Sequence, residues 1–118
     1  MFEKNLELGL LLDFYGDILP ERRRSMMDLY YNDDLSLSEV AEQLGVTRQA
    51  VRETVKKTEA ELLFYEEKLG LLRRFTRAQE CAARLRTLCD GAETELPPAL
   101  REELQVEVER LCAAVGDE

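Results

Sequence analysis

Apolar residues recur at intervals of three and four along nearly the whole chain, which is the spacing of one face of an α-helix. No segment alternates β-branched and polar residues in the way that a half-buried strand does. The 118 residues include only six glycines and three prolines, so few turns are available. The pattern predicts an all-α fold with few or no strands.

Two helices are expected in the first third of the chain. The first covers about residues 3–16, and its predicted buried stripe consists of Phe2, Leu6, Leu10 and Phe14. The second begins at Pro20, whose fixed φ suits a first helical turn, and ends at the turn-forming cluster of residues 32–34. Together they supply the first apolar surfaces of a helical bundle.

Capping signals mark the next two helices. Ser36 and Glu39 have the spacing of a capping box, in which each side chain satisfies a backbone N–H of the other residue. Gly45 is placed to close this helix, and Thr47 is placed to cap the following one. The two helices are therefore expected to be joined directly by a tight turn, without a longer linker.

This pair has the requirements of a helix-turn-helix. The motif needs a small residue where the helices touch, a turn residue that tolerates positive φ, and an apolar residue on the second helix. Ala41, Gly45 and Val51 supply these at offsets of four and six. An ordinary helical corner is the alternative, but it does not require all of these signals together. We therefore predict a helix-turn-helix.

The helix after the turn is expected to be long. Its apolar seam, at alternating spacings of four and three, consists of Val51, Val55, Thr58, Leu62, Tyr65, Leu69 and Leu72. The pattern then slips by one residue near Gly70, which marks a kink or a break. The continued stripe consists of Leu71, Phe75, Ala78, Ala82, Leu85 and Cys89.

The C-terminal part is expected to be a helical extension with an acidic tail. Its last helix begins at Pro97-Pro98 and carries the apolar residues Leu100, Leu104, Val108, Leu111 and Val115. We therefore divide the chain into a helix-turn-helix domain, residues 1–75, and an extension, residues 76–118. Because the first two helices cover only part of the long seam, we predict a homodimer in which a second copy buries the rest, with cover by the extension as the alternative.

The net charge of −9 is unevenly distributed. Residues 48–57 carry four basic side chains and one acidic one, Glu53, on a chain that is otherwise acidic. Arginine and glutamine read base edges and lysine suits phosphate, so we predict a nucleic-acid-binding surface. We call it the basic arc, and it consists of Arg48, Gln49, Arg52, Lys56 and Lys57. A solvated charged face is the alternative interpretation.

A second basic group lies on the following helix. It consists of Arg73, Arg74, Arg77, Arg84 and Arg86. These arginines are placed either to follow a nucleic-acid backbone or to pair with the acidic C-terminal helix, and the sequence leaves both interpretations open.

Enzymatic and metal chemistry is not expected. The chain has no histidine, no glycine-rich phosphate loop and no C-x-x-C pair, so we predict no catalytic residues, no cofactor and no metal site. Cys81, Cys89 and Cys112 are expected to be buried, reduced thiols of a cytoplasmic protein. No apolar run reaches the length of a membrane helix, and the N-terminus lacks the features of a signal peptide.

Several ordered motifs in residues 2–75 resemble the YlxM/p13-like family (UPF0122). They are Asp13-Phe14-Tyr15, the segment 29–37, Glu39-Val40-Ala41, Arg48-Gln49-Ala50-Val51, Lys57-Thr58-Glu59 and the segment 65–69. This family is similar to the DNA-binding region 4 of bacterial sigma factors, so the resemblance implies a fold of that kind. Family members often carry an aromatic residue after the Arg-Gln-Ala-Val motif, where this chain has Arg52. No family motif is recognisable beyond about Cys89.

The resemblance implies a bacterial cytoplasmic regulator linked to the signal recognition particle, because family members are encoded beside the particle's GTPase and its receptor. We therefore expect a non-enzymatic accessory protein that binds nucleic acid, either the particle RNA or DNA, and also the particle GTPase. A sequence-specific transcription regulator that reads two half-sites as a dimer is the alternative. A protein-only adaptor is a third possibility.

Overall fold

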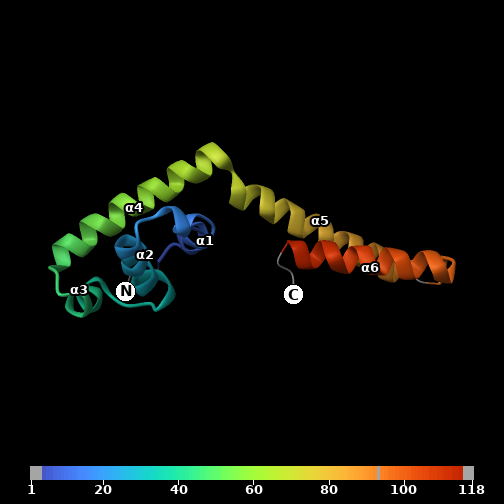
Figure 1. Cartoon of the computed structure of the whole chain (residues 1–118), viewed down its shortest axis with the longest axis horizontal. Coiled ribbons are helices and arrows are strands. Elements are labelled where there is room, and N and C mark those ends of the chain that lie inside the picture. The colour runs from blue at the N-terminus through green and yellow to red at the C-terminus, as the bar shows by residue number, and fades with distance from the viewer. Residues whose placement is uncertain (1–3, 93, 116–118) are drawn as a thin grey trace. The chain divides into compact units, whose positions relative to one another are not determined.

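The computed structural model describes residues 4–92 and 94–115, and across these residues the chain forms six α-helices and no strand (Figure 1). The all-α prediction is therefore confirmed. The helices group into two compact units, residues 1–72 and residues 73–118. None of the described helices is both long enough and apolar enough to cross a membrane.

Helix α1 (Leu6–Tyr15) buries a different face from the one predicted. Leu8, Leu11, Leu12 and Tyr15 are its buried side chains, whereas Leu6 is 86% exposed and Leu10 49% exposed. Apolar side chains lie on both faces of this helix, so the apolar pattern alone does not decide which face is buried. Phe2, the first member of the predicted stripe, lies outside the described residues.

The second predicted helix is interrupted in its hydrogen bonding. A 3₁₀ turn (η1, Gly16–Ile18) and Pro20 precede α2 (Glu21–Met27), which runs directly into a π-helical segment (η2, Asp28–Asn32). Met26 and Met27 are buried in the core of the first unit. The π-helical turn was not foreseen, since the sequence pattern of a single π turn does not differ from that of an α-helix.

Helix α4 (Arg48–Leu69) is the long element of the first unit, and α1, α2 and α3 (Leu37–Leu44) pack along it (Figure 1). Val51, Val55, Thr58 and Leu62 are its buried residues. Tyr65 and Leu72, farther along the predicted seam, pack against the core that α1 supplies. The first unit thus covers most of the seam within one chain, and only Leu69 of that seam stays about half exposed, at 48%.

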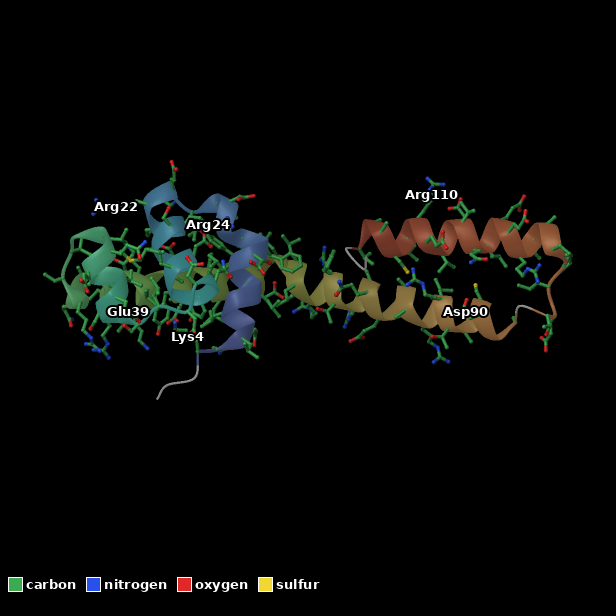
Figure 2. The ribbon with its side chains drawn as sticks, turned by 90° about the horizontal axis from the view of Figure 1, so that it is seen from below. Lys4, Arg22, Arg24, Glu39, Asp90 and Arg110 are labelled. Atoms are coloured by element: carbon green, nitrogen blue, oxygen red, sulfur yellow. The ribbon has the colours of Figure 1, made fainter. Side chains whose placement is uncertain are left out.

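The predicted break at Gly70 is confirmed. Gly70 has φ 64° and ψ 29°, a left-handed conformation that ends α4, and α5 (Leu71–Gly91) begins at the next residue. In the second unit α5 and α6 (Pro98–Ala114) run side by side as a helical hairpin (Figures 1 and 2).

The small core of the hairpin contains part of the predicted stripes and adds Cys112. Ala82, Val108, Cys112 and Val115 are buried, and Phe75, Ala78 and Cys89 pack against them. Leu85, Leu100 and Leu111 are exposed, contrary to prediction, because two helices in a hairpin bury only a narrow strip of each other. The prediction of buried cysteines holds for Cys112, whereas Cys89 is half-buried and Cys81 is exposed.

Candidate nucleic-acid interface

The turn between α3 and α4 is fixed by local hydrogen bonds. The Ser36 Oγ accepts from the Glu39 amide across 3.1 Å, and Glu39 Oε1 accepts from the Ser36 amide across 3.0 Å, so the capping box is present. Gly45 ends α3 with φ 70°, and the Thr47 hydroxyl accepts from the Ala50 amide across 3.0 Å at the start of α4. These three predicted capping features are confirmed.

Burial on both helices completes the helix-turn-helix. Val40 and Ala41 of α3 are buried together with Val51 and Val55 of α4. The Val46 amide donates to the Ala41 carbonyl across 3.1 Å, which closes the chain reversal behind Gly45. The apolar side of α4 is therefore held against α3, and the opposite side of its first turns is left for solvent or a ligand.

The basic arc occupies that free side. Arg48, Arg52 and Lys56 follow one another at steps of four residues, and Gln49 and Lys57 flank this row. All five side chains are exposed on α4, while Val51 and Val55 between them are buried. The structure thus brings the predicted residues together on one helical surface, in the place where a recognition helix meets a groove.

One acidic residue lies within the arc. Glu53 is exposed, and its Oε1 accepts from the Gln49 Nε2 across 3.1 Å. This hydrogen bond orients the Gln49 amide along the helix and occupies part of the Glu53 carboxylate. A ligand that uses Gln49 must therefore either replace this hydrogen bond or contact both side chains.

Contacts from other helices fix the position of α4. Arg23 of α2 forms an ion pair with Glu61, with 2.7 Å between Nη1 and Oε2. Tyr31 donates its phenol hydrogen to Glu59, and burial, followed by this hydrogen bond, raises the pKa of Tyr31. Both partners on α4 lie just beyond the basic arc, so they hold the helix without covering the arc.

Two of the three consecutive arginines on α2 are engaged in the fold. Arg23 pairs with Glu61, and Arg24 pairs with Asp17 and Asp28 across 2.9 and 3.3 Å. Arg22 is exposed on the same helix (Figure 2). The sequence could not separate structural from exposed arginines here, because the acidic partners of Arg23 and Arg24 are set by tertiary contacts.

The N-terminal segment is held against the residues that precede α3. Lys4 Nζ donates to the carbonyl oxygens of Tyr30 and Leu35 and forms an ion pair with Asp34 across 3.1 Å. It also lies 4.0 Å from the centre of the Tyr30 ring. Sequence reasoning missed this lysine, since carbonyl groups leave no signature in the residue pattern.

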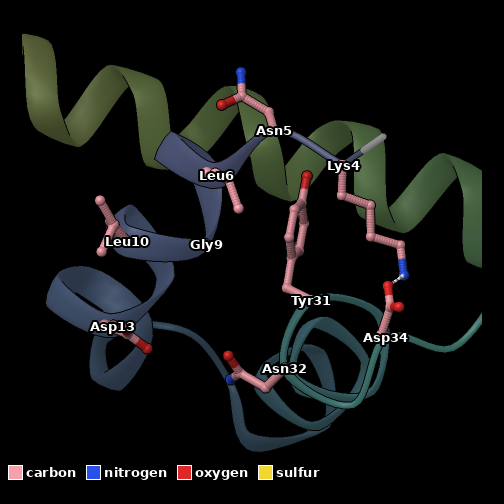
Figure 3. A pocket seen from close by; sticks show the side chains of 9 residues that line it. All are labelled: Lys4, Asn5, Leu6, Gly9, Leu10, Asp13, Tyr31, Asn32 and Asp34. Carbon is pink, nitrogen blue, oxygen red and sulfur yellow. Dashed lines mark hydrogen bonds and ion pairs between the residues drawn. The ribbon is translucent and has the colours of Figure 1, made fainter. Parts of the chain in front are cut away.

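A groove of about 520 Å³ lies beside Lys4 (Figure 3). Its lining residues are Lys4, Asn5, Leu6, Gly9, Leu10, Asp13, Tyr31, Asn32 and Asp34. None of them belongs to the basic arc. Among the described residues no cluster of three or more histidine, cysteine, aspartate or glutamate side chains is arranged to hold a metal ion.

The fold and the capped turn define a helix-turn-helix protein, and comparison with known proteins agrees. The family described as "Putative helix-turn-helix protein, YlxM / p13 like" (UPF0122) matches residues 2–96. The chain is 46% identical over 105 residues to the UPF0122 protein of Geobacillus kaustophilus, covering 86% of this chain and 96% of that protein. It is 48% identical over 93 residues to a UPF0122 protein of Bacillus cereus, covering 79% and 84%.

The chain therefore belongs to the UPF0122 family. The match extends farther than the resemblance recognised in the sequence, which ended near residue 75. It includes all of α5 and stops before α6.

Proposed function

We propose that the protein is a non-enzymatic, cytoplasmic accessory protein of the bacterial signal recognition particle pathway that binds nucleic acid through the basic arc. The observation that carries the proposal is the gathering of Arg48, Gln49, Arg52, Lys56 and Lys57 on the exposed side of the second helix of a helix-turn-helix. A helix in this position is the one that enters a groove in proteins with this motif.

Charge supports a modest interaction with phosphate groups. The arc carries four positive charges next to Glu53, on a chain with a net charge of −9. Phosphate contacts dominate nucleic-acid affinity, so a surface of this size favours binding that depends on a second contact or on a partner protein. An accessory protein of a ribonucleoprotein particle meets both conditions, since RNA and a protein surface are presented together.

The resemblance to YlxM/p13-like proteins supplies the link to the particle, and the particle RNA is therefore the proposed ligand. The particle GTPase is the proposed protein partner. Neither assignment requires a catalytic group on this chain.

Affinity capture from a bacterial lysate tests the proposal. The tagged full chain should recover the particle RNA and the targeting GTPase, and the RNA should be depleted when Arg48, Arg52, Lys56 and Lys57 are all replaced by alanine. Recovery of neither component by the unaltered chain would reject the link to the particle. Since all four side chains are exposed, the fold of the variant should be unchanged, which circular dichroism checks.

Selection of bound genomic DNA tests the alternative function. The helix-turn-helix itself favours a transcription regulator, which would read half-sites separated by about one helical turn of DNA. Enrichment of one palindromic sequence by the full chain would favour this alternative over an RNA-binding accessory protein.

A further inference from the structure

The outward face of α5 carries a row of exposed arginines. Arg73, Arg77 and Arg84 are separated by four and seven residues, and this spacing places them in line along the helix. Arg74 lies at the edge of the row, and all four side chains are exposed. We call these four residues the α5 arginine stripe.

The stripe points away from the core of the hairpin. Phe75 and Ala82, which contribute to that core, each lie two residues before a stripe member, Arg77 and Arg84. A step of two residues turns a helix by about 200°, so these arginines project from the side opposite to the buried one. Helix α6 covers the buried side, and hence pairing with the acidic α6 does not explain the position of Arg77 and Arg84.

The dimensions of the stripe suit an extended polyanion. Eleven residues separate Arg73 from Arg84, which corresponds to about 16 Å along the helix axis. One acidic residue, Glu80, is exposed within the row, and beyond Arg84 the exposed face becomes apolar at Leu85 and Leu88. Arginine donates several N–H groups in a planar fork and is suited to phosphate oxygens.

We propose that the α5 arginine stripe is a second phosphate-backbone contact for the same RNA that the basic arc binds. This inference rests on the proposed function, and it supplies the additional contact that the small basic arc needs. The stripe binds without reading sequence, because its arginines meet phosphates along a straight helix and not base edges in a groove.

Salt dependence of RNA binding tests the stripe. The probe is a fluorescein-labelled 20-base-pair RNA duplex, titrated with the full chain at several salt concentrations. Arg77→Ala with Arg84→Ala should weaken binding and flatten the slope of log affinity against log salt by about 1.4–1.8, since two phosphate contacts are lost. When the salt concentration rises from 50 to 200 mM, the factor by which the affinity falls should therefore be about tenfold smaller for the double variant than for the unaltered chain.

Two matched variants control for charge and for unspecific effects. Arg77→Lys with Arg84→Lys keeps both charges and should keep the slope. Arg110→Ala removes an exposed arginine from α6, where it pairs with Glu107 and projects away from α5 (Figure 2), and should also leave the slope unchanged.

Cys81 provides a second readout that does not depend on a substitution. Its exposed thiol lies four residues after Arg77 and three before Arg84, on the same face. Bound RNA duplex should slow alkylation of Cys81 by a maleimide, measured by peptide mass spectrometry, while half-buried Cys89 keeps its rate. Protection of Cys81 by polyglutamate but not by RNA would overturn the proposal in favour of an acidic protein partner.

The outcomes separate this inference from the proposed function. A normal slope for Arg77→Ala with Arg84→Ala and an unprotected Cys81 overturn the stripe, whatever Lys56→Ala with Lys57→Ala does. If the slope flattens in Arg77→Ala with Arg84→Ala but is unchanged in Lys56→Ala with Lys57→Ala, the stripe is supported and the basic arc is rejected. Absence of RNA binding by the unaltered chain at 50 mM salt overturns both.

Discussion

The phenol of Tyr15 on α1 and the carboxylate of Glu66 on α4 hydrogen bond to each other and together hold the first turn of α5. Tyr15 Oη donates to Glu66 Oε1 across 2.7 Å and accepts from the Leu71 amide across 3.0 Å. The same Glu66 oxygen accepts from the Leu72 amide across 3.0 Å. Because the first N–H groups of a helix have no acceptor within it, these two side chains act as the cap of α5.

Removing the phenol oxygen should therefore destabilise the first unit. Tyr15→Phe keeps the buried ring but leaves the Leu71 amide and Glu66 without their shared partner, at an expected cost of about 1–3 kcal/mol in the free energy of unfolding. Urea denaturation measures this difference. Tyr65→Phe is the control, because it removes a hydroxyl from a ring only 5.8 Å away without affecting the α5 amides. Equal losses in the two variants would show that the cap does not contribute.

This cap also shows where sequence reasoning stopped. The break at Gly70 could be predicted, because a one-residue slip in an apolar seam has few other causes. The cap could not, since Tyr15 and Glu66 are 51 residues apart and their contact depends on how α1 lies on α4. For the same reason the buried face of α1 was assigned wrongly, whereas the local capping box of Ser36 and Glu39 was assigned correctly.

The basic arc likewise has features that the sequence could predict and features that it could not. That Arg48, Gln49, Arg52, Lys56 and Lys57 share the exposed side of one helix followed from helical periodicity and from the burial expected at Val51 and Val55. The sequence could not predict the hydrogen bond between Gln49 and Glu53, because side chains at positions i and i+4 can either pair or remain apart. Whether the arc contacts RNA stays a prediction.

Substitution of Gly45, the left-handed residue of the turn, should destabilise the fold through backbone strain alone. Gly45 has φ +70° and no atom within 4 Å of an added Cβ, so Gly45→Ala strains the backbone without a steric clash. We expect a loss of about 1–2 kcal/mol in the free energy of unfolding. Gly91→Ala is the matched control, since an added Cβ there also meets open space and its φ is not positive. If both variants unfold at the same urea concentration, the turn does not require glycine.

The capping box should make stability depend on pH. The Glu39 carboxylate accepts a hydrogen bond from the Ser36 backbone N–H, and this bond lowers the pKa of Glu39 most. A hydrogen bond with the Ser36 side chain lowers the pKa further. A carboxylate with a lowered pKa in the folded state stabilises above its ordinary pKa, and this contribution disappears as the pH falls through the lowered value. The difference in unfolding free energy between the unaltered chain and Glu39→Gln should therefore shrink from pH ~7 to pH ~3.

Urea denaturation at both pH values checks this sign. Glu42→Gln removes one negative charge from the same helix outside the capping box, and it controls for the change in net charge. A difference that grows on acidification would show that the ionised form of Glu39 does not stabilise the helix.

The apolar surface left for the predicted homodimer is smaller than the sequence suggested, because most of the α4 seam is covered within one chain. Leu62 is fully buried within the chain, whereas Leu63, Phe64 and Leu69 are each about half exposed on α4. If Leu69 lies in the contact, Leu69→Asp should convert a dimer into a folded monomer and change the monomer's free energy of unfolding by no more than about 0.5 kcal/mol. Leu62→Asp should instead unfold the first unit. Light scattering that gives 13.6 kDa for the unaltered chain at high concentration would reject the dimer.

The salt dependence of binding to the particle RNA, compared between the unaltered chain and Lys56→Ala with Lys57→Ala, tests the basic arc most directly. The four basic residues of the arc alone support a slope of log affinity against log salt of about −2 to −4. We expect the double variant to bind more weakly and its slope to be flatter by about 1.4–1.8, since two phosphate contacts are lost. Lys68→Ala, near the other end of the same helix, should leave the slope unchanged. An unchanged slope in the double variant would contradict the assignment of the RNA-binding surface to α4.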